Sequence, residues 1–376
     1  MSAPLRLLML CAYPAGAAAT RFRVCEYLDA LRDGGIEPDV RPFISEDYFA
    51  GMYRPTRVAR KAAALGGFAL AKLPLLLAAG RYDAVFIQRE AALVGPPLLE
   101  RFLVQRRRLP LIYDLDDAVW LEPAPVPGTL RARFPRLVGA IRGAAKGDAL
   151  LAMATSVVAG SRFLADHARR FCPDVEVLPT VVRRERWRPR PGRLDGSFLQ
   201  DPPLLGWIGT PSTSVYLSMV FPALERLARE GFRFRLRVRG ALPSIGSDRF
   251  PLENLPWRQE HEIDDFSEFD IGLGPIRRDP WADGKSGFKQ LQYMAVGVPM
   301  VTSLVGGTRD FIEHGRNALV AGSEEDWYDH LRALLTRPEL RASLAREGRR
   351  VVEERYCIEA QGPRLAGVIR RAAGKV

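Results

Sequence analysis

The stretch FDIGLGPIRRDPWADGKSGFKQLQYMAVGVPMVTS, residues 269–303, decides the fold class. Its apolar start at 269–276 is typical of a buried strand, and the turn-forming residues that follow lead into a helical pattern. A glycine and a proline then end the helix and open a second short apolar run at 299–303. A strand, a helix and a strand in this order predict a βαβ unit with two parallel strands.

The same alternation runs through the whole chain, and it predicts an α/β fold. In the first half the expected strands are 5–11, 37–43, 83–88, 109–115, 150–160 and 175–182. In the second half they are 203–209, 232–240, 254–258, 269–276, 299–303 and 318–322. Two such series predict two doubly wound domains, each with a parallel sheet. The stretch 186–203 between them is rich in Pro, Gly and Arg, which predicts a linker.

Composition narrows the class of partner without naming one. The chain has 376 residues and a formal net charge of +11, which favours anionic partners such as nucleotides, phospholipid surfaces or nucleic acid. Its four cysteines and four histidines are dispersed, with no spacing typical of a metal site. We therefore expect no metal and a reducing compartment, the cytoplasm. The N-terminus lacks the features of a signal peptide and fits a first strand better.

The most apolar stretch is 57–83, and it has two interpretations. Lys72 and Pro74 interrupt it, which argues against a membrane-spanning helix. One interpretation is a helix that covers a face of the sheet. The other is an interfacial helix with basic anchors, which would give peripheral contact with the inner face of the membrane.

Two lysines mark the loop and helix of the opening stretch as a phosphate site. Lys285 and Lys289 are four residues apart, and on a helix such positions share a face, so both ammonium groups are expected to converge on one anion. Gln292 is expected to reach a ribose hydroxyl from the same helix. The alternative is an ordinary solvated helix face.

Carboxylates gather at the end of another strand. Asp114, Asp116 and Asp117 crowd the end of the strand at 109–115, and Glu90 ends the neighbouring strand. Capping of the next helix would use one aspartate and not three. Because like charges this close raise at least one pKa, a ligand rich in hydroxyls or a cation is expected to relieve them.

Small residues follow the first strand of each half. Gly16 lets the backbone approach a ligand, and Arg21 follows on the next helix. Gly209, Thr210 and Ser212 form a strand–helix turn whose N–H groups would accept a diphosphate. A plain turn explains the first motif equally well, and helix capping alone explains the hydroxyls of the second.

Together these motifs resemble the GT-B glycosyltransferases of family 4 over most of the chain. The segments that carry the resemblance are YPAGAAATRFRVCEYL, FIQRE, YDLDDAVW, GWIGTPST, FDIGLGPI, GKSGFKQLQYMAVGVPMV and AREGRRVVEERY. Their order along the chain matches that of the family.

The resemblance implies two Rossmann-like domains that face each other across a cleft. Residues 1–185 would bind the acceptor, 186–203 would be the linker, and 204–352 would bind a nucleotide-sugar donor. Residues 353–376 would form a helix that crosses back to the N-terminal domain. The family transfers sugars with retention of configuration and usually needs no metal, because fixed cations and N–H groups stabilise the leaving diphosphate.

Two departures from the family pattern affect the donor site. The family's EX7E motif has glutamates at two positions where this chain has Gly284 and Gln292. We infer that the phosphate cations are Lys285 and Lys289, because the usual Arg and Lys after the first C-terminal strand are also missing. Asp116 stands where a histidine is common and is expected to contact donor-sugar hydroxyls.

The resemblance also assigns roles to the remaining residues. Trp257 and Arg258 follow a strand where the family places its nucleobase. The expected catalytic residues are Asp116, Asp117, Lys285 and Lys289. The expected donor-binding residues are Gly16, Gly209, Thr210, Ser212, Trp257, Arg258 and Gln292, and the expected acceptor-binding residues are Arg21, Glu90 and Asp114.

The predicted function is transfer of a sugar from a nucleoside diphosphate to a glycan, a lipid or a secondary metabolite. A catalytically silent protein that binds a sugar nucleotide or a glycan is the alternative, because the two glutamates are missing. Nucleic-acid binding is disfavoured, since the arginines are dispersed and no RNA-binding motif or recognition helix is found.

Overall fold

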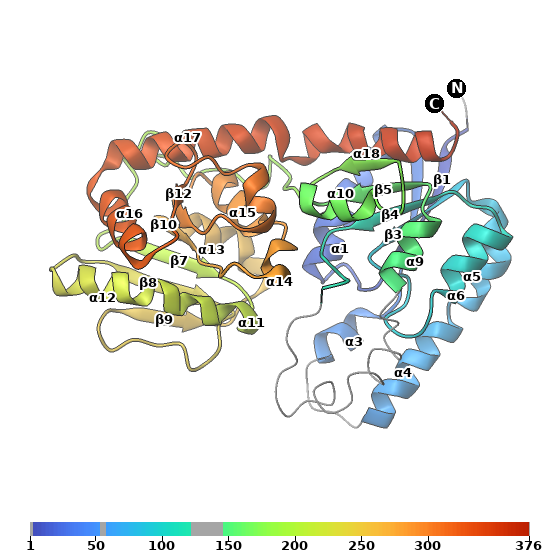
Figure 1. The fold of residues 1–376 in the computed structure, drawn as a ribbon, viewed down its shortest axis with the longest axis horizontal. Helices are drawn as coiled ribbons and strands as arrows, with labels where there is room; N and C mark the ends of the chain where they lie inside the picture. The colour runs from blue at the N-terminus through green and yellow to red at the C-terminus, as the bar shows by residue number, and fades with distance from the viewer. Residues whose placement is uncertain (1–2, 53–57, 122–145, 376) are drawn as a thin grey trace. The chain divides into compact units, whose positions relative to one another are not determined.

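The structure is a computed structural model, and it divides into two compact units (Figure 1). The first unit comprises Met1–Thr180 and Gln361–Val376, and the second comprises Val181–Ala360. The residues that the structure describes are 3–52, 58–121 and 146–375.

The first unit is built on a six-stranded sheet with the order β2-β1-β3-β4-β5-β6, and every pairing in it is parallel. Its strands are β1 Leu5–Cys11, β2 Ile36–Pro42, β3 Ala84–Gln88, β4 Leu111–Leu115, β5 Ser156–Ala159 and β6 Val175–Val177. Its described α-helices are α1 Ala18–Arg23, α2 Leu28–Asp33, α3 Glu46–Gly51, α4 Val58–Leu70, α5 Leu73–Ala78, α6 Leu98–Arg101, α9 Lys146–Met153 and α10 Arg162–Ala168.

The second unit repeats this plan with the strand order β12-β11-β10-β7-β8-β9. Its strands are β7 Leu204–Ile208, β8 Arg235–Arg239, β9 Leu252–Leu255, β10 Ile271–Gly274, β11 Met300–Thr302 and β12 Leu319–Val320. Its α-helices are α11 Pro211–Ser214, α12 Phe221–Arg229, α13 Glu262–Glu268, α14 Pro280–Asp283, α15 Phe288–Ala295, α16 Glu324–Thr336 and α17 Pro338–Arg355. The last helix, α18 Ile358–Ala372, begins in this unit and ends in the first.

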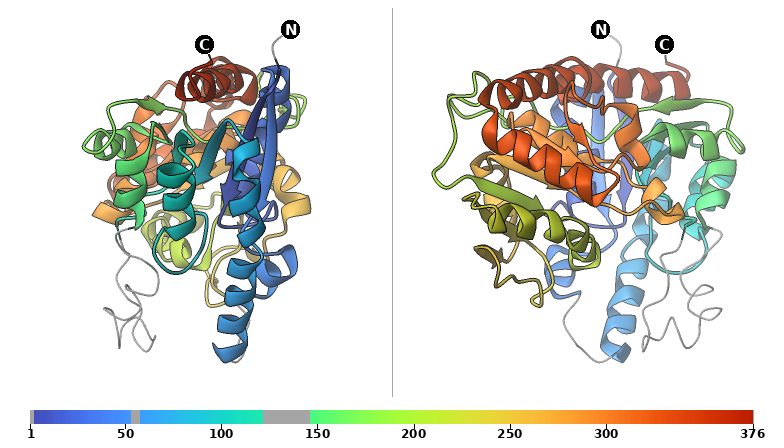
Figure 2. Two further views of the ribbon diagram at one scale, coloured as in Figure 1. Left: turned by 90° about the vertical axis from the view of Figure 1, so that its right-hand side faces the viewer. Right: turned by 60° about the vertical axis from the view of Figure 1, so that its left-hand side comes forward.

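The burial of the central strands agrees with their parallel pairing. Every residue of β3, β4 and β7 is buried, as expected for strands covered by helices on both faces (Figures 1 and 2). In β8, RLRVR, only Leu236 and Val238 are buried, so this strand has one covered face. The central strands thus form the cores, and their carboxyl ends lead into the loops that carry the polar motifs.

The predicted α/β fold with two parallel sheets is confirmed, and one strand prediction needs correction. The run at 150–160 was expected to be a single strand, but α9 continues to Met153 and β5 begins at Ser156. Leu150 and Leu151 are buried on α9. A short apolar run is equally compatible with a buried helix face, and packing decided between the two here.

Candidate functional site

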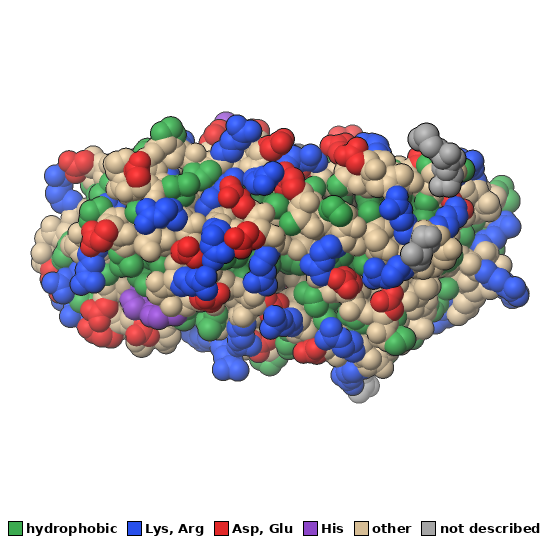
Figure 3. All heavy atoms as spheres, turned by 90° about the horizontal axis from the view of Figure 1, so that it is seen from above, with side chains coloured by type: hydrophobic (Ala, Val, Ile, Leu, Met, Phe, Trp, Pro, Cys, Tyr) green, Lys and Arg blue, Asp and Glu red, His purple; other side chains and the backbone are tan. Residues whose placement is uncertain are grey.

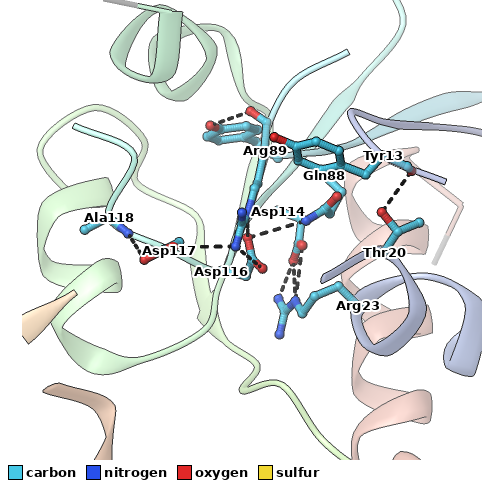
Figure 4. A network of polar contacts seen from close by, with 10 residues as sticks. Tyr13, Thr20, Arg23, Gln88, Arg89, Asp114, Asp116, Asp117 and Ala118 are labelled. Carbon is cyan, nitrogen blue, oxygen red and sulfur yellow. Dashed lines mark hydrogen bonds and ion pairs between the residues drawn. The ribbon is translucent and has the colours of Figure 1, made fainter. Parts of the chain in front are cut away.

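The carboxylates at the end of β4 have different environments (Figure 4). Asp114 is fully buried and accepts hydrogen bonds from Nε of Arg23 at 3.1 and 3.2 Å. Arg23 also donates to the carbonyl of Leu178 at 2.6 Å. Burial raises the pKa of Asp114 above its usual value, although Arg23 opposes this shift. This geometry is that of a structural ion pair, and the carboxylate is already occupied.

Asp116 is held by a residue that sequence reasoning missed. Arg89 donates to its two oxygens, from Nε at 2.5 Å and from Nη2 at 3.0 Å. Burial alone would raise the pKa of Asp116, but Arg89 outweighs burial and lowers it below the usual value. Arg89 has a φ of 61°, a left-handed conformation that is uncommon outside glycine and often found at functional sites.

Asp117 and Glu90 are the more accessible carboxylates of this cluster. The Asp117 side chain is 30% exposed and lies 3.6 Å from Arg89, and it accepts a hydrogen bond from the amide of Ala118 at 3.1 Å. Glu90 accepts a hydrogen bond from Lys146 at 3.1 Å. Both side chains are therefore partly exposed.

Gln88, the last residue of β3, is the second group that sequence reasoning missed. Its amide nitrogen is 3.5 Å from Asp116, and its Oε1 is buried without a partner among the described residues. A polar residue that ends an otherwise apolar strand was the available signal.

The remaining motif of the first unit does not join this cluster directly. The amide of Gly16 donates to Oε1 of Glu46 at 3.0 Å. The guanidinium of Arg21 lies 4.6 Å from the ring centre of Phe22. It is Arg23, two positions further along α1, that faces the aspartates.

In the second unit, the two lysines do not share a helix face, which corrects the prediction. Lys285 lies in the turn after α14, and α15 begins only at Phe288, with Gly287 as its N-cap at a φ of 73°. Lys289 is therefore the second residue of the helix. The two charges are nevertheless close enough for Lys285 to lower the pKa of Lys289.

Aromatic rings contact both lysines. Nζ of Lys285 lies 3.8 Å from a ring centre of Trp281, which is a cation–π contact. Nζ of Lys289 lies 5.2 Å from a ring centre of Trp207. Through Trp207, a residue near the end of β7, this strand therefore contacts Lys289 of α15.

Lys289 is the most perturbed lysine of this region. Loss of hydration, with a smaller effect of Lys285, lowers its pKa to about 8. No carboxylate of the described residues compensates the charge. None of the described side chains caps the first turn of α15. An ammonium group and an uncapped helix N-terminus at one place favour a bound anion.

The turn after β7 is tightly packed and internally capped. A Cβ at residue 209 would lie 2.2 Å from atoms of the Trp207 ring, so only glycine fits. Thr210 and Thr213 form a capping box, and the Thr210 hydroxyl is 3.0 Å from that of Ser212. Capping therefore does account for these hydroxyls, as the alternative interpretation stated.

The other predicted donor residues lie in different surroundings. Gln292 is 3% exposed and donates to Oε1 of Glu262 on α13 at 3.2 Å. Arg258 is exposed and lines an open hollow of about 580 Å³, together with Arg239 and His261. Trp257 is half-buried and is not one of the lining residues of that hollow. Within the described ranges, no group of three or more His, Cys, Asp or Glu is placed to hold a metal.

Comparison with known proteins gives two results, a match of one segment to a family model and matches of the whole fold to solved structures. Residues 222–362 match the family model described as glycosyl transferase-like, and this segment includes Lys285, Lys289 and Gln292. No curated protein matches the chain.

Solved structures match over the whole length. Anabaena HepE in complex with UDP has a TM-score of 0.67 at 14% identity, covering 98% of this chain and 100% of its own. A glycosyltransferase from Rickettsia africae has a TM-score of 0.67 at 12% identity, with 100% of both chains covered. Sucrose-phosphate synthase from Thermosynechococcus elongatus has a TM-score of 0.66 at 14% identity, covering 99% of this chain and 100% of its own. The fold is therefore that of the GT-B glycosyltransferases.

Proposed function

We propose that this chain transfers a sugar from a nucleoside-diphosphate sugar to a glycan, a lipid or a small-molecule acceptor. The observation that carries the proposal is Lys289, a half-buried lysine with no described carboxylate partner at the uncapped start of α15, where loss of hydration lowers its pKa. This residue lies inside the segment that matches the glycosyl transferase-like model. A cation in a poorly hydrated position stabilises an anion far better than a solvated one does.

In the proposed reaction, Lys285, Lys289 and the N-terminus of α15 bind the diphosphate. Negative charge grows on the diphosphate as its bond to the sugar breaks, so groups already pointed at it lower the barrier. These fixed cations take the place that a metal ion has in other transferases. We assign Gln292 a supporting role, because its contact with Glu262 fixes α15 to α13.

The proposed donor is a UDP-sugar, and the proposed mechanism is the retaining one of family 4. For the donor, the support is that Anabaena HepE, a protein of similar fold, has been crystallised with UDP and with UDP-glucose. For retention, the support is the resemblance of the sequence motifs to family 4. We place the reaction in the cytoplasm, in agreement with four free cysteines.

For the acceptor side, we propose that Asp116, Asp117 and Glu90 accept hydrogen bonds from sugar or acceptor hydroxyls. Arg89 favours the ionised form of Asp116, which is the form that accepts such bonds, because it lowers the pKa of that carboxyl. Asp114 acts through its ion pair with Arg23 and not by direct contact.

The test is the substitution Lys289→Ala, assayed by release of UDP from a panel of UDP-sugars with candidate acceptors. Loss of one stabiliser of developing charge should lower the rate constant by about 10²–10³-fold. Lys375→Ala is the matched control, because that lysine is exposed, belongs to the first unit and pairs with Asp83 of the same unit. Equal turnover in Lys289→Ala and the wild type would refute the phosphate assignment.

A silent binding protein is the second candidate, favoured by Gly284 and Gln292 at the positions of the family's two glutamates. It predicts that the chain binds UDP-sugars but releases no UDP above the blank with any acceptor. Isothermal titration with UDP tests both candidates, because each of them requires that UDP binds. If UDP neither binds nor is released, both candidates are wrong.

A further inference from the structure

Helices α4 and α5 present an apolar surface to solvent. Leu70, Leu73 and Leu77 are 66%, 52% and 85% exposed. Between residues 63 and 80 the only charged side chain is Lys72, whose ammonium donates to the carbonyl of Pro42. Figure 2 shows that α4 stands out from its unit.

This surface is not the outer side of an ordinary amphipathic helix. The inner sides of both helices are apolar as well: Phe68 contacts the rings of Phe43 and Tyr48, and Leu75 is buried in the core. A surface helix of a soluble protein carries polar residues on its solvent side, and a helix that is apolar all round is normally covered. Residues 63–81 have a mean hydropathy of 1.6, yet only 11% of that window is buried. Something outside the described part of the unit is therefore expected to cover it.

Five exposed arginines, called here the arginine rim, lie on α4, on α6 and in the run that follows α6, and one of them contacts α5. Arg107 donates to the carbonyl of Leu76 at 3.0 Å, so the run that follows α6 lies beside α5. Leu98, on α6, adds a further exposed leucine at 65%. Within the described ranges none of the rim arginines forms an ion pair with an acidic side chain, and all are exposed: Arg60, Arg101, Arg106, Arg107 and Arg108.

We propose that α4, α5 and the arginine rim dock the first unit on an anionic lipid bilayer. Leucines would enter the headgroup region while the guanidinium groups contact lipid phosphates, the arrangement of an interfacial helix with basic anchors. A protein partner could also cover the leucines. A lipid surface is the better match, because arginines without described acidic partners favour a strongly anionic surface. The proposal is independent of sugar transfer.

The surface lies on the bilayer and does not cross it. The stretch 63–81 is long and apolar enough to span a membrane. However, α4 ends at Leu70 and α5 starts at Leu73, and Phe68 and Leu75 hold both helices on the unit. A spanning helix would need to give up these contacts.

The experiment is co-sedimentation of the full chain with vesicles that contain phosphatidylglycerol, against vesicles of phosphatidylcholine alone. The wild type should bind the anionic vesicles more tightly, and added salt should weaken the binding. The triple variant Leu70→Ser, Leu73→Ser, Leu77→Ser should bind at least about tenfold more weakly for each leucine that inserts. The variant Arg106→Glu, Arg108→Glu should lose the preference for anionic lipid.

Leu199→Ser is the matched control, since Leu199 is an exposed leucine of the second unit, and it should bind as the wild type does. The melting temperatures of all variants should change by only a few degrees, because the substituted side chains are largely exposed. Unchanged binding of the triple variant would overturn the proposal. A dimer of the wild type that forms without vesicles, and that the triple variant does not form, would also overturn it, because a second copy would then cover the leucines. Bound protein that resists extraction by salt and alkali would overturn it as well, because a helix would then span the bilayer.

Discussion

At the scale of single residues, Lys289 is the central group of the proposed phosphate site. Its ammonium loses hydration and has Lys285 as a like-charged neighbour, and both effects lower its pKa, to about 8. A bound diphosphate would reverse both effects, because it supplies opposite charge where none of the described carboxylates does. Ligand binding and protonation of this residue are therefore linked.

This linkage predicts the pH dependence of UDP affinity. Below pH 8 Lys289 is protonated and binding is strong, since its pKa is about 8. As the pH rises above this value the free protein loses the charge, so affinity should fall, by up to about tenfold per pH unit for one proton. The diphosphate adds little to this change, since its last ionisation lies near pH 6 and is largely complete.

Titration calorimetry at about pH 7, 8 and 9 measures this effect. The variant Lys289→Arg is the control, because arginine stays protonated throughout, so its affinity should be nearly independent of pH in this range. An equally steep fall for Lys289→Arg would assign the titration to another group.

Among the elements, the N-terminus of α15 depends on a glycine. Gly287 has a φ of 73°, and a Cβ there would lie 2.7 Å from Cγ2 of Thr308 and 3.1 Å from its amide. The left-handed conformation disfavours any other residue, and the contact with Thr308 leaves no space for one. The glycine thus sets the direction in which the first turn of α15 points.

We predict that Gly287→Ala destabilises the second unit by about 2–3 kcal/mol and also weakens UDP binding. Gly231→Ala is the control, since Gly231 has a φ of 86° and a Cβ there would have nothing within 4 Å. It should cost about 1–2 kcal/mol and leave UDP affinity unchanged. Urea unfolding and calorimetry give the two quantities, and equal effects of the two substitutions would contradict the role assigned to Thr308.

For the whole molecule, the two sheets give each unit its own core, so each can respond to ligand separately. The net charge is +11, and on the side drawn in Figure 3 the basic and acidic side chains are interspersed. On α17, for example, Arg350 pairs with Glu347 and Glu354 at 2.9 and 2.8 Å. On this face, basic side chains therefore do not gather into the continuous patch that nucleic-acid binding needs.

We predict that UDP protects amides of Val181–Ala360 against hydrogen exchange, chiefly in α15 and the loop before it. Binding stabilises the unit that holds the ligand, which lowers the population of its open states. Exchange followed by mass spectrometry measures this protection peptide by peptide. Protection confined to residues of the first unit would place the nucleotide in the wrong half for the proposed mechanism.

The sequence alone was sufficient for the class of fold. Strands such as β3, β4 and β7 are short continuous apolar runs between turn residues, and local pattern is enough to find them. It failed at 150–160, where an apolar run belongs half to α9 and half to β5. The motif residues could also be found, because polar groups at strand ends stand out against apolar runs.

Which of these polar groups face one another was decided only by the tertiary structure. The three aspartates in and just after the end of β4 look alike in sequence, yet Asp114 is buried against Arg23 while Asp116 is held by Arg89. Those arginines lie on α1 and at the end of β3, far away along the chain. Burial and pairing depend on such distant partners, so local sequence determines where a charged group can occur, and only packing determines whether it is free to bind.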